Sequence, residues 1–405
     1  MKAVLIAPSN NFFLNPLIAE PLGLMYIEAV LKQMDIDVEM IDTSFESTIP
    51  EGDLYCFSAA TIHYPQILKL SKKIKGYKVI GGPHASALPL EVKEHFDAVV
   101  VGPGTSAIVD VITDFNATGS GGVFRSPVSD INSIPLAPRS ILHKHKYTPF
   151  PKAPISASMI TSMGCPYKCS FCASNAIWGR RVFNYSVDKV VEEIKYLKST
   201  FGINHFKFVD DTLTLNKRRF KEVSNALIPL DVKWICNTRI DALDDEILDQ
   251  MVNSGCDYVD LGVESVDNNV LEKINKHQKI EQVELAIKKI KSKKMKVKVY
   301  LIYGLPFEPK DIVQKTISFI ERNEPDHVSL FTLVPYPGTD ICDNYEKYNI
   351  KKLHDDFGVY QHSVGGKAEE LEWLPSVEYN DRSRELMRDE RNVLKLYADD
   401  WNNRR

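Results

Sequence analysis

The chain has 405 residues, enough for two or three domains with separate hydrophobic cores. Hydrophobic residues make up 44% of the sequence and charged residues 26%, a balance that excludes an intrinsically disordered chain. The formal net charge of -4 gives no reason to expect nucleic acid as a partner. No apolar run reaches the roughly 18 residues of a membrane span, and the short apolar run at the N-terminus predicts a β-strand rather than a signal peptide.

Residues 1–118 alternate apolar runs with helical stretches. The runs are continuous rather than alternating, which is typical of parallel strands covered on both faces. The pattern predicts an α/β fold with a doubly wound, Rossmann-like parallel sheet of about five strands. The predicted strands begin at Lys2, Asp37, Leu54, Tyr77 and Asp97.

Small residues follow four of these predicted strands. Ligands bind such sheets at the carboxyl ends of the strands, and glycine lets a ligand approach the backbone closely. Ordinary tight turns use the same residues, but four such ends together favour a binding site. The candidate binding residues are Ser58, Thr61, Gly81, Gly82, His84, Gly102 and Gly104.

Residues 119–152 are rich in glycine, serine and proline and predict a mostly extended linker. A second βα series occupies residues 153–345 and predicts a partial (β/α)6 TIM-like barrel. Residues 346–405 predict a helical C-terminal extension that covers part of the barrel. The six predicted barrel strands begin near Ile155, His205, Val232, Tyr258, Lys296 and His327.

The chain has seven cysteines, and the segment "TSMGCPYKCSFCASN" holds three of them as C-x3-C-x2-C: Cys165, Cys169 and Cys172. Thiolates bind zinc or iron–sulfur clusters, and structural zinc normally needs a fourth ligand. The ten residues on either side contain no histidine and no fourth cysteine. An iron–sulfur cubane with three protein ligands leaves one iron free, so the missing ligand favours an open catalytic site.

The other four cysteines, Cys56, Cys236, Cys256 and Cys342, lie far apart in the sequence. An odd count with this spacing argues against a disulfide framework. It predicts a reducing compartment, the cytoplasm.

Polar residues follow the other predicted barrel strands in phase with the cysteines. Reactive residues of such barrels lie at the carboxyl ends of the strands, so the set predicts one polar mouth. Its members are Asp210, Asp211, Asn237, Arg239, Glu264, Ser265, Tyr303, Gly304 and Tyr336.

The segment "CPYKCSFC" resembles the C-x3-C-x-Φ-C motif of the radical S-adenosylmethionine (SAM) superfamily, with Phe171 as the aromatic residue Φ. Residues 1–345 are similar to its branch with an N-terminal cobalamin (B12)-binding domain. The matching segments are "EPLGLMYIEAVL", "VIGGPHAS", "FVDDTLT", "WICNTRID", "SGCDYVDLGVES", "LIYGLPFE" and "PYPGT".

The resemblance implies that the three cysteines hold a [4Fe–4S] cluster whose free iron binds SAM. One-electron reduction, by a partner such as flavodoxin or ferredoxin, would then cleave SAM to a 5′-deoxyadenosyl radical. Cobalamin would carry a methyl group. The protein supplies positioning and shielding, since the radical chemistry belongs to the cofactors.

Within this resemblance, the mouth residues match the groups of SAM. Either Asp210 or Asp211 suits the amine, and Arg239 offers a planar donor fork to the carboxylate. Two neighbouring positions, Glu264 and Ser265, would bind the ribose hydroxyls. Alternatively, Arg239 pairs with a barrel carboxylate and Asp211 faces the substrate.

Aromatic residues complete the expected site. Phe171 and the backbone at Tyr303 and Gly304 would flank the adenine. Tyr336 is a candidate catalytic residue, and packing is its alternative role.

Two features depart from the family pattern for cobalamin. The D-x-H-x-x-G motif, which supplies a histidine to the cobalt, is absent. Of the ligand-side histidines His63 and His84, the latter fits the family's G-G-P-H turn and would contact the cobalamin tail. The segment "VVVGPGTSA" stands where relatives usually have G-E-G-E.

The leading hypothesis is cobalamin-dependent methylation of an unactivated carbon of a small molecule. The alternative is a non-methylating radical reaction, such as cyclisation, dehydration, oxidation or rearrangement. A third hypothesis is a zinc-stabilised binding module without catalysis. Methylthiotransferases are disfavoured because their N-terminal domain brings three more cysteines, whereas this one has only Cys56. The lysine-rich run at residues 288–300 predicts a solvated helix end rather than a nucleic-acid site.

Overall fold

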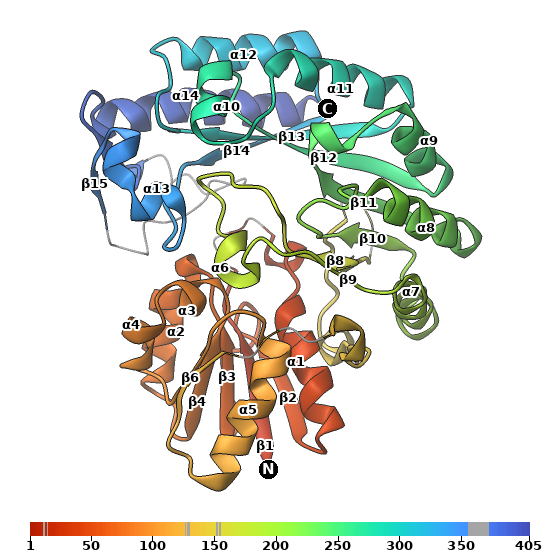
Figure 1. Cartoon of the computed structure of the whole chain (residues 1–405), viewed down its shortest axis with the longest axis vertical. Coiled ribbons are helices and arrows are strands. Elements are labelled where there is room, and N and C mark those ends of the chain that lie inside the picture. The colour runs from red at the N-terminus through yellow and green to blue at the C-terminus, as the bar shows by residue number, and fades with distance from the viewer. Residues whose placement is uncertain are drawn as a thin grey trace.

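The computed structural model describes residues 1–10, 13, 15–125, 127, 130–150, 153, 155–354 and 372–405. Two α/β units follow each other along the long axis of the molecule (Figure 1). The N-terminal unit lies at one end and the barrel unit at the other, with the short helix α6 (Ser174–Trp178) between them. Within the described residues, no helix has the length and apolarity that a membrane crossing requires.

The N-terminal unit contains a sheet of six parallel strands in the order β2-β1-β3-β4-β5-β6. This confirms the predicted Rossmann-like fold, in which the strand order reverses beside β1. The sheet extends past residue 118 because β6 pairs with β5 from within the predicted linker. The strands are β1 (Lys2–Ala7), β2 (Asp37–Asp42), β3 (Leu54–Ser58), β4 (Tyr77–Gly81), β5 (Ala98–Val100) and β6 (Gly122–Phe124).

Helices cover both faces of this sheet, as its continuous apolar strands require. One face packs against α1 (Leu22–Gln33) and α5 (Gly104–Ala117), and its buried side chains belong to a cluster that continues into the barrel. The other face packs against a separate cluster that includes residues of three short helices. These helices are α2 (Tyr64–Ser71), α3 (Pro83–Ala87) and α4 (Pro89–Lys93).

The second unit is the predicted partial barrel. Its six parallel strands have the order β14-β13-β12-β11-β10-β7. They are β7 (Ala157–Met159), β10 (His205–Phe208), β11 (Lys233–Thr238), β12 (Cys256–Glu264), β13 (Lys296–Tyr303) and β14 (His327–Thr332). The outer helices are α7 (Val187–Phe201), α8 (Lys217–Leu227), α9 (Asp245–Asn253), α10 (Asn268–Lys273), α11 (Ile280–Ser292) and α12 (Ile312–Asn323).

Short elements complete the connections. The two-stranded pair β8 (Ser162–Met163) and β9 (Phe183–Asn184) flanks the cysteine segment, and α13 (Asp340–Asp343) follows the last barrel strand. The 3-10 helices are η1 (Pro16–Ile18), η2 (Thr61–His63), η3 (Ile131–Ser133), η4 (Ser140–His143), η5 (Ile228–Leu230), η6 (Ile240–Ala242) and η7 (Tyr345–Tyr348).

The C-terminal extension contains the predicted helix, α14 (Arg384–Asn403), and an antiparallel strand pair that the sequence analysis did not predict. The pair consists of β15 (Ile350–Leu353) and β16 (Val377–Tyr379). Helix α14 packs along β14 at the open edge of the barrel. There the Asn402 side chain accepts a hydrogen bond from the Val328 N–H (2.8 Å) and donates one to the Val328 carbonyl (2.9 Å). These contacts protect an edge that would otherwise expose unpaired backbone groups.

Parts of all four predicted segments lie outside the described residues. They are positions 11, 12 and 14 of the N-terminal domain, 126, 128, 129, 151 and 152 of the linker, 154 of the barrel and 355–371 of the extension.

A buried ion network joins the two units. Arg139, in the segment between them, is 0% exposed and has a left-handed backbone conformation (φ 53°). Its Nη2 donates to Glu193 Oε1 of α7 at 2.5 Å and to the carbonyl of Ser158 on β7 at 3.0 Å. Its Nη1 lies 3.6 Å from Oε2 of Glu20, which precedes α1.

Glu20 completes the network by accepting a hydrogen bond from the Ser158 N–H at 2.6 Å. Burial raises the pKa of Glu20 to about 7, and Arg139 opposes this shift. One guanidinium therefore links the N-terminal unit, the connecting segment and the barrel.

The first prediction concerns this network. We expect Arg139→Met to lower the free energy of unfolding by about 3–5 kcal/mol, because it leaves two carboxylates buried without their cation. Denaturant unfolding followed by circular dichroism measures the change. The control is Arg218→Met, because Arg218 forms an exposed i,i+4 pair with Glu222 and should cost less than about 1 kcal/mol. Equal losses in both variants would contradict the role of Arg139.

Candidate functional site

The cysteine segment begins at a turn that only glycine can form. Gly164 has φ +88°, and a Cβ at this position would lie 2.1 Å from the carbonyl oxygen of Arg181. β8 therefore turns sharply into the loop that carries Cys165, Cys169 and Cys172, and α6 follows. All three thiols are half-buried.

The three cysteines line a cavity of about 510 Å³ at the mouth of the barrel, here called the mouth cavity. This volume lies within the range of about 300–1,000 Å³ that is typical of small-molecule sites. The structure brings together the following predicted residues in its wall: Cys165, Cys169, Phe171, Cys172, Asp210, Asp211, Asn237, Arg239, Glu264 and Tyr336.

Arg239 connects the cysteine loop to the barrel. Its Nη1 donates to Cys169 Sγ at 3.5 Å, and its guanidinium lies 3.8 Å from the centre of the Tyr167 ring. Its Nε and Nη2 donate to the Asp241 carboxylate (2.9 and 3.1 Å), and Nη2 also donates to the carbonyl of Lys276 (2.7 Å). Arg239 therefore forms a carboxylate pair, with Asp241 as the partner, and holds the loop in place.

The two neighbouring aspartates differ in their environments. Asp210 is buried and accepts hydrogen bonds from the Thr161 N–H, the Thr161 hydroxyl and the Ser162 hydroxyl, at 3.0, 2.8 and 2.6 Å. Asp211 is exposed to the cavity and accepts from Ser174 Oγ at 3.0 Å. Desolvation by the surrounding protein raises the pKa of both carboxyl groups. Asp210 thus supports the start of the cysteine loop, and Asp211 keeps acceptor capacity for a ligand.

Glu264 forms a buried ion pair in the cavity wall. Its Oε1 accepts from Lys276 Nζ at 2.7 Å, and its backbone has a positive φ of 66°. A strained backbone at a non-glycine residue often accompanies function. The second oxygen of the carboxylate remains available for a ligand in the cavity.

Three predicted SAM contacts lie elsewhere. Ser265 does not line the mouth cavity, and its Oγ accepts from the Asp267 N–H at 3.3 Å. The side chain of Tyr303 points away from the mouth cavity and hydrogen-bonds to Glu390 and Arg382 of the C-terminal extension. Gly304 donates to Glu308 at 3.0 Å, and its carbonyl accepts from Tyr379 at 2.9 Å.

The physical reason is strand alternation. Successive side chains of a strand point to opposite faces, so Tyr300 and Ile302 of β13 face the mouth cavity while Tyr303 faces outward. Ser265, Tyr303 and Gly304 are not among the residues that line the mouth cavity, and their contacts with SAM stay predictions.

The mouth cavity is also lined by polar residues that were not predicted from the sequence. They are Tyr167, Lys207, Thr212, Thr238, Asp260, Lys276, Tyr300 and Thr332. A usable signal was present in the strands, because β10, β12 and β13 alternate polar and apolar residues, as in "KVKVY" from Lys296. Lys276 had no such signal, since it lies in a loop far from the cysteines in sequence.

The donor set fits a [4Fe–4S] cluster with three cysteine ligands. Among the described residues, no three His, Cys, Asp or Glu side chains converge on one point as the ligands of a single ion do. The thiols instead surround a cavity, and a cluster binds each thiolate at a different iron. Burial raises the pKa of Cys165, and it raises the pKa of Cys172 to about 12.

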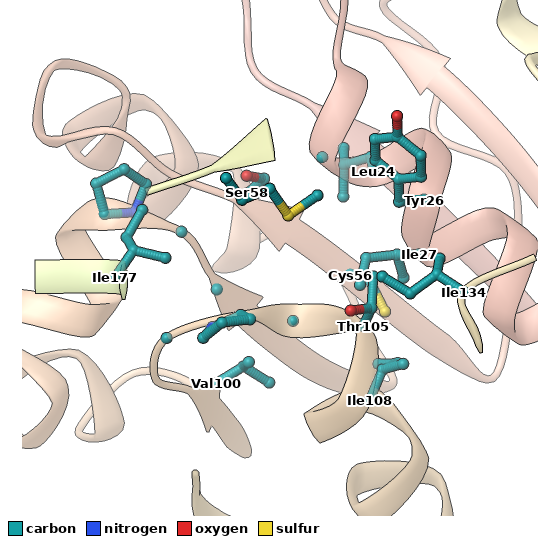
Figure 2. Close-up of a pocket in the computed structure, with 18 of the residues that line it drawn as sticks. Leu24, Tyr26, Ile27, Cys56, Ser58, Val100, Thr105, Ile108, Ile134 and Ile177 are labelled. Carbon is teal, nitrogen blue, oxygen red and sulfur yellow. The ribbon is translucent and has the colours of Figure 1, made fainter. Parts of the chain in front are cut away.

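A second cavity of about 240 Å³ lies at the carboxyl ends of β3, β4 and β5 (Figure 2). Its wall is mostly apolar and includes Leu24 and Ile27 of α1, Ile108 of α5 and Ile177 of α6. We call it the apolar slot. Five predicted residues line it: Ser58, Gly81, Gly82, Gly102 and Gly104.

Among these five residues, position 82 requires glycine. Gly82 has φ +98°, and a Cβ there would lie 2.8 Å from the carbonyl oxygen and 2.9 Å from the nitrogen of Ala59. The altered segment "GPGT", residues 102–105, also lines the slot. Its place at the strand ends is that of a ligand-binding loop, although it lacks the carboxylates usual in the family.

Thr61 and His84 do not line the apolar slot. His84 is 0% exposed, its ring centroid lies 4.1 Å from that of Tyr64, and its Nδ1 lies 3.3 Å from Thr61 Oγ1. Tyr64 belongs to the hydrophobic cluster on the opposite face of the sheet from the slot. Burial lowers the pKa of His84 to about 4. The structure therefore does not support Thr61 and His84 as cofactor contacts.

The slot fits one end of a cobalamin molecule rather than the whole. Its walls are apolar, its floor is lined by glycines, and its volume is below that of sites for drug-sized ligands. A flat heteroaromatic base suits these dimensions, while the corrin ring would need the space outside.

One segment forms part of both cavities. Ile160, Met163, Ile177 and Trp178 line the apolar slot, and the cysteines between them line the mouth cavity. Residues 160–178 are therefore a common wall between the two sites.

The second prediction tests the thiols. We expect Cys165→Ala, Cys169→Ala and Cys172→Ala each to lose most of the iron, which should be about four atoms per chain in the reconstituted protein. Metal analysis and electron paramagnetic resonance after reduction measure this. Cys342→Ala is the control, because that half-buried thiol does not line the mouth cavity. One zinc and no iron in the wild-type protein would contradict the cluster assignment.

Two family models match the chain. The Radical SAM superfamily model matches residues 159–320, which hold the cysteines and the barrel strands β10 to β13. The B12 binding domain model matches residues 16–112, which hold most of the N-terminal sheet. Each matched range holds most of the residues that line one of the two cavities.

Individual proteins are also similar to this chain over most of its length. An uncharacterized methyltransferase of Pyrococcus horikoshii is 28% identical over 384 residues, which cover 84% of this chain and 82% of the relative. The anaerobic magnesium-protoporphyrin IX monomethyl ester cyclase of Rubrivivax gelatinosus is 27% identical over 308 residues, covering 67% of this chain and 55% of the cyclase.

A solved structure has the same fold. The radical S-adenosylmethionine methyltransferase TsrM from Kitasatospora setae, with cobalamin and a [4Fe–4S] cluster bound, superimposes with a TM-score of 0.65 at 17% identity. The match covers 84% of this chain and 76% of TsrM. The chain therefore contains a radical SAM domain at residues 159–320 and, before it, a B12-binding domain at residues 16–112.

Proposed function

We propose that the protein is a cobalamin-dependent radical SAM methyltransferase that methylates an unactivated carbon of a small molecule. The observation that carries the proposal is the common wall at residues 160–178. It separates a site suited to one end of cobalamin from a site suited to a cluster and SAM. A substrate at the barrel mouth would then lie within reach of both cofactors.

When bound, the reduced cluster with SAM supplies a 5′-deoxyadenosyl radical, and cobalamin supplies a methyl group. The residues of the chain bind SAM and hold the cysteine loop in position. Asp211 accepts a hydrogen bond from the SAM amine, because Asp210 already accepts three hydrogen bonds from the protein. Arg239 keeps the cysteine loop against the barrel through Cys169 and Asp241. Phe171 lies where it can flank the adenine.

Tyr336 has a further role in this proposal. It is half-buried in the wall of the mouth cavity, and burial raises the pKa of its hydroxyl above the usual value. It therefore stays protonated and can donate a hydrogen bond to the substrate.

The relatives support methyl transfer and also define the alternative. The Pyrococcus horikoshii relative is named a methyltransferase and TsrM is a methyltransferase, whereas the Rubrivivax gelatinosus relative is a cyclase. The cyclase and the altered segment at residues 102–105 favour a non-methylating radical reaction as the second candidate.

We also propose a one-electron donor such as flavodoxin or ferredoxin as the partner and the cytoplasm as the location. All seven cysteines are free thiols, which suits a reducing compartment. A reduced iron–sulfur cluster also needs a reducing environment.

The third prediction separates the two candidates by their products. With SAM, reductant and cobalamin under anaerobic conditions, the reconstituted protein should release both S-adenosylhomocysteine and 5′-deoxyadenosine. Liquid chromatography with mass spectrometry quantifies both products. Cys169→Ala should lose 5′-deoxyadenosine because the cluster lacks a ligand. Release of 5′-deoxyadenosine without S-adenosylhomocysteine, from protein shown to hold cobalamin, would favour the non-methylating reaction.

The fourth prediction concerns a variant whose new side chain would occupy the apolar slot. Ser58→Phe places a ring at the end of β3, where Figure 2 shows Ser58 at the slot. We expect retained cobalamin to fall about tenfold, an effect typical of overpacking, while the iron content stays unchanged. Absorption spectra after gel filtration measure both. Val109→Phe on the exposed side of α5 is the control, and equal retention in both variants would show that the slot is not used.

A further inference from the structure

The interior of the barrel is polar. Barrel interiors are usually filled by branched apolar residues, but here alternate positions on four strands carry Lys207, Asp260, Lys298, Tyr300 and Ser329. The strand register pairs Asp260 with Lys298 and Tyr300 with Ser329. Lys207, Asp260 and Tyr300 line the mouth cavity.

Three of these residues, Asp260, Lys298 and Tyr300, interact with one another. The Tyr300 hydroxyl donates to Asp260 Oδ2 at 2.9 Å, and the Lys298 ammonium lies 4.7 Å from the centre of the Tyr300 ring. Burial lowers the pKa of Lys298, the Asp260 carboxylate opposes this shift, and Lys207 adds to it. The Asp260 carboxylate therefore compensates the charge of Lys298, and the ammonium of Lys207 is a second positive charge nearby.

Lys207 has no partner of its own. Across the part of the chain that the structure describes, its ammonium makes no hydrogen bond or ion pair, although the side chain is only partly exposed. It lines the mouth cavity together with the cysteines. A partly buried cation without a partner is costly unless a ligand supplies the opposite charge.

The same cavity contains unused neutral donors. Thr332 at the end of β14 is 7% exposed, and its Oγ1 is buried without a hydrogen-bond partner among the described residues. The side-chain amide of Asn237 at the end of β11 also faces the cavity. A hydroxyl and an amide are donors that bind oxyanions.

We propose that Lys207 binds an oxyanion of the substrate, a carboxylate or a phosphate, inside the barrel, with Thr332 and Asn237 as further donors on the cavity wall. This inference rests on the proposed function and names the substrate class of that site. Lys207 lies within β10 and precedes Asp210, which follows the strand, by three residues, an extended length of about 10 Å. The anionic end of the substrate lies deep in the barrel, and the reacting carbon lies nearer the cysteines.

The test measures anion binding rather than turnover. Cluster-reconstituted protein is titrated with inorganic phosphate and, separately, with 13C-acetate, and the 31P or 13C relaxation of the anion gives the affinity. Lys207→Met should weaken binding by about 10- to 100-fold, as expected for a lost charge-assisted hydrogen bond, while Lys207→Arg should keep most of it. Tighter phosphate binding would indicate a phosphorylated substrate, and tighter acetate binding a carboxylate.

Three controls make the result decisive. Lys288→Met removes an exposed lysine of α11 and should bind both anions as the wild type does. Iron content shows that each variant is folded. The affinity for SAM, measured by calorimetry, should be the same in Lys207→Met as in the wild type.

Two outcomes would overturn the inference. One is anion binding that is equal in Lys207→Met and Lys288→Met. The other is displacement of phosphate and acetate by SAM together with weakened SAM binding in Lys207→Met, which would assign the lysine to SAM. Neither outcome depends on S-adenosylhomocysteine release, so failure of the proposed methyl transfer would be recognised separately.

Discussion

The buried guanidinium of Arg139 is the constraint on which the arrangement of the two sites depends. It lies between Glu20 before the first helix and Glu193 on a barrel helix, and it also binds the backbone of Ser158. A buried charge of this kind tolerates little displacement, because each partner would otherwise be left without compensation. The N-terminal unit and the barrel therefore share one orientation, and their two cavities meet at one wall.

That wall is the cysteine segment. It is positioned locally by Gly164 and Asp210, and from the barrel by Arg239, which touches Cys169 and pairs with Asp241. The loop is thus supported before any cluster binds. Pre-organised ligands lower the ordering cost of binding, so this support favours a cluster held at the boundary of both cavities.

The two cavities differ in chemistry. The apolar slot is lined by glycines and aliphatic side chains, which suits a flat group that is held by burial. The mouth cavity contains ion pairs, aspartates and the lone cation Lys207, which suits SAM and a polar substrate. A radical formed in the mouth cavity would be surrounded mostly by side chains that already have hydrogen-bond or ion-pair partners, and only a few would remain available to ligands.

Sequence patterns alone determined the two parallel folds, the grouping of the three cysteines and the glycine-lined strand ends, because strand periodicity and short motifs are local properties. Only the tertiary structure decided where side chains at the strand ends point. Tyr303 and Ser265 lie outside the mouth cavity, and His84 packs against Tyr64 on the far face of the sheet. It also decided the contacts of Arg139 with Glu20 and Glu193, which lie 119 and 54 residues away in the sequence, and the isolation of Lys207 inside the barrel. Such contacts join residues that are distant along the chain, and they exist only once the strands have closed around a common interior.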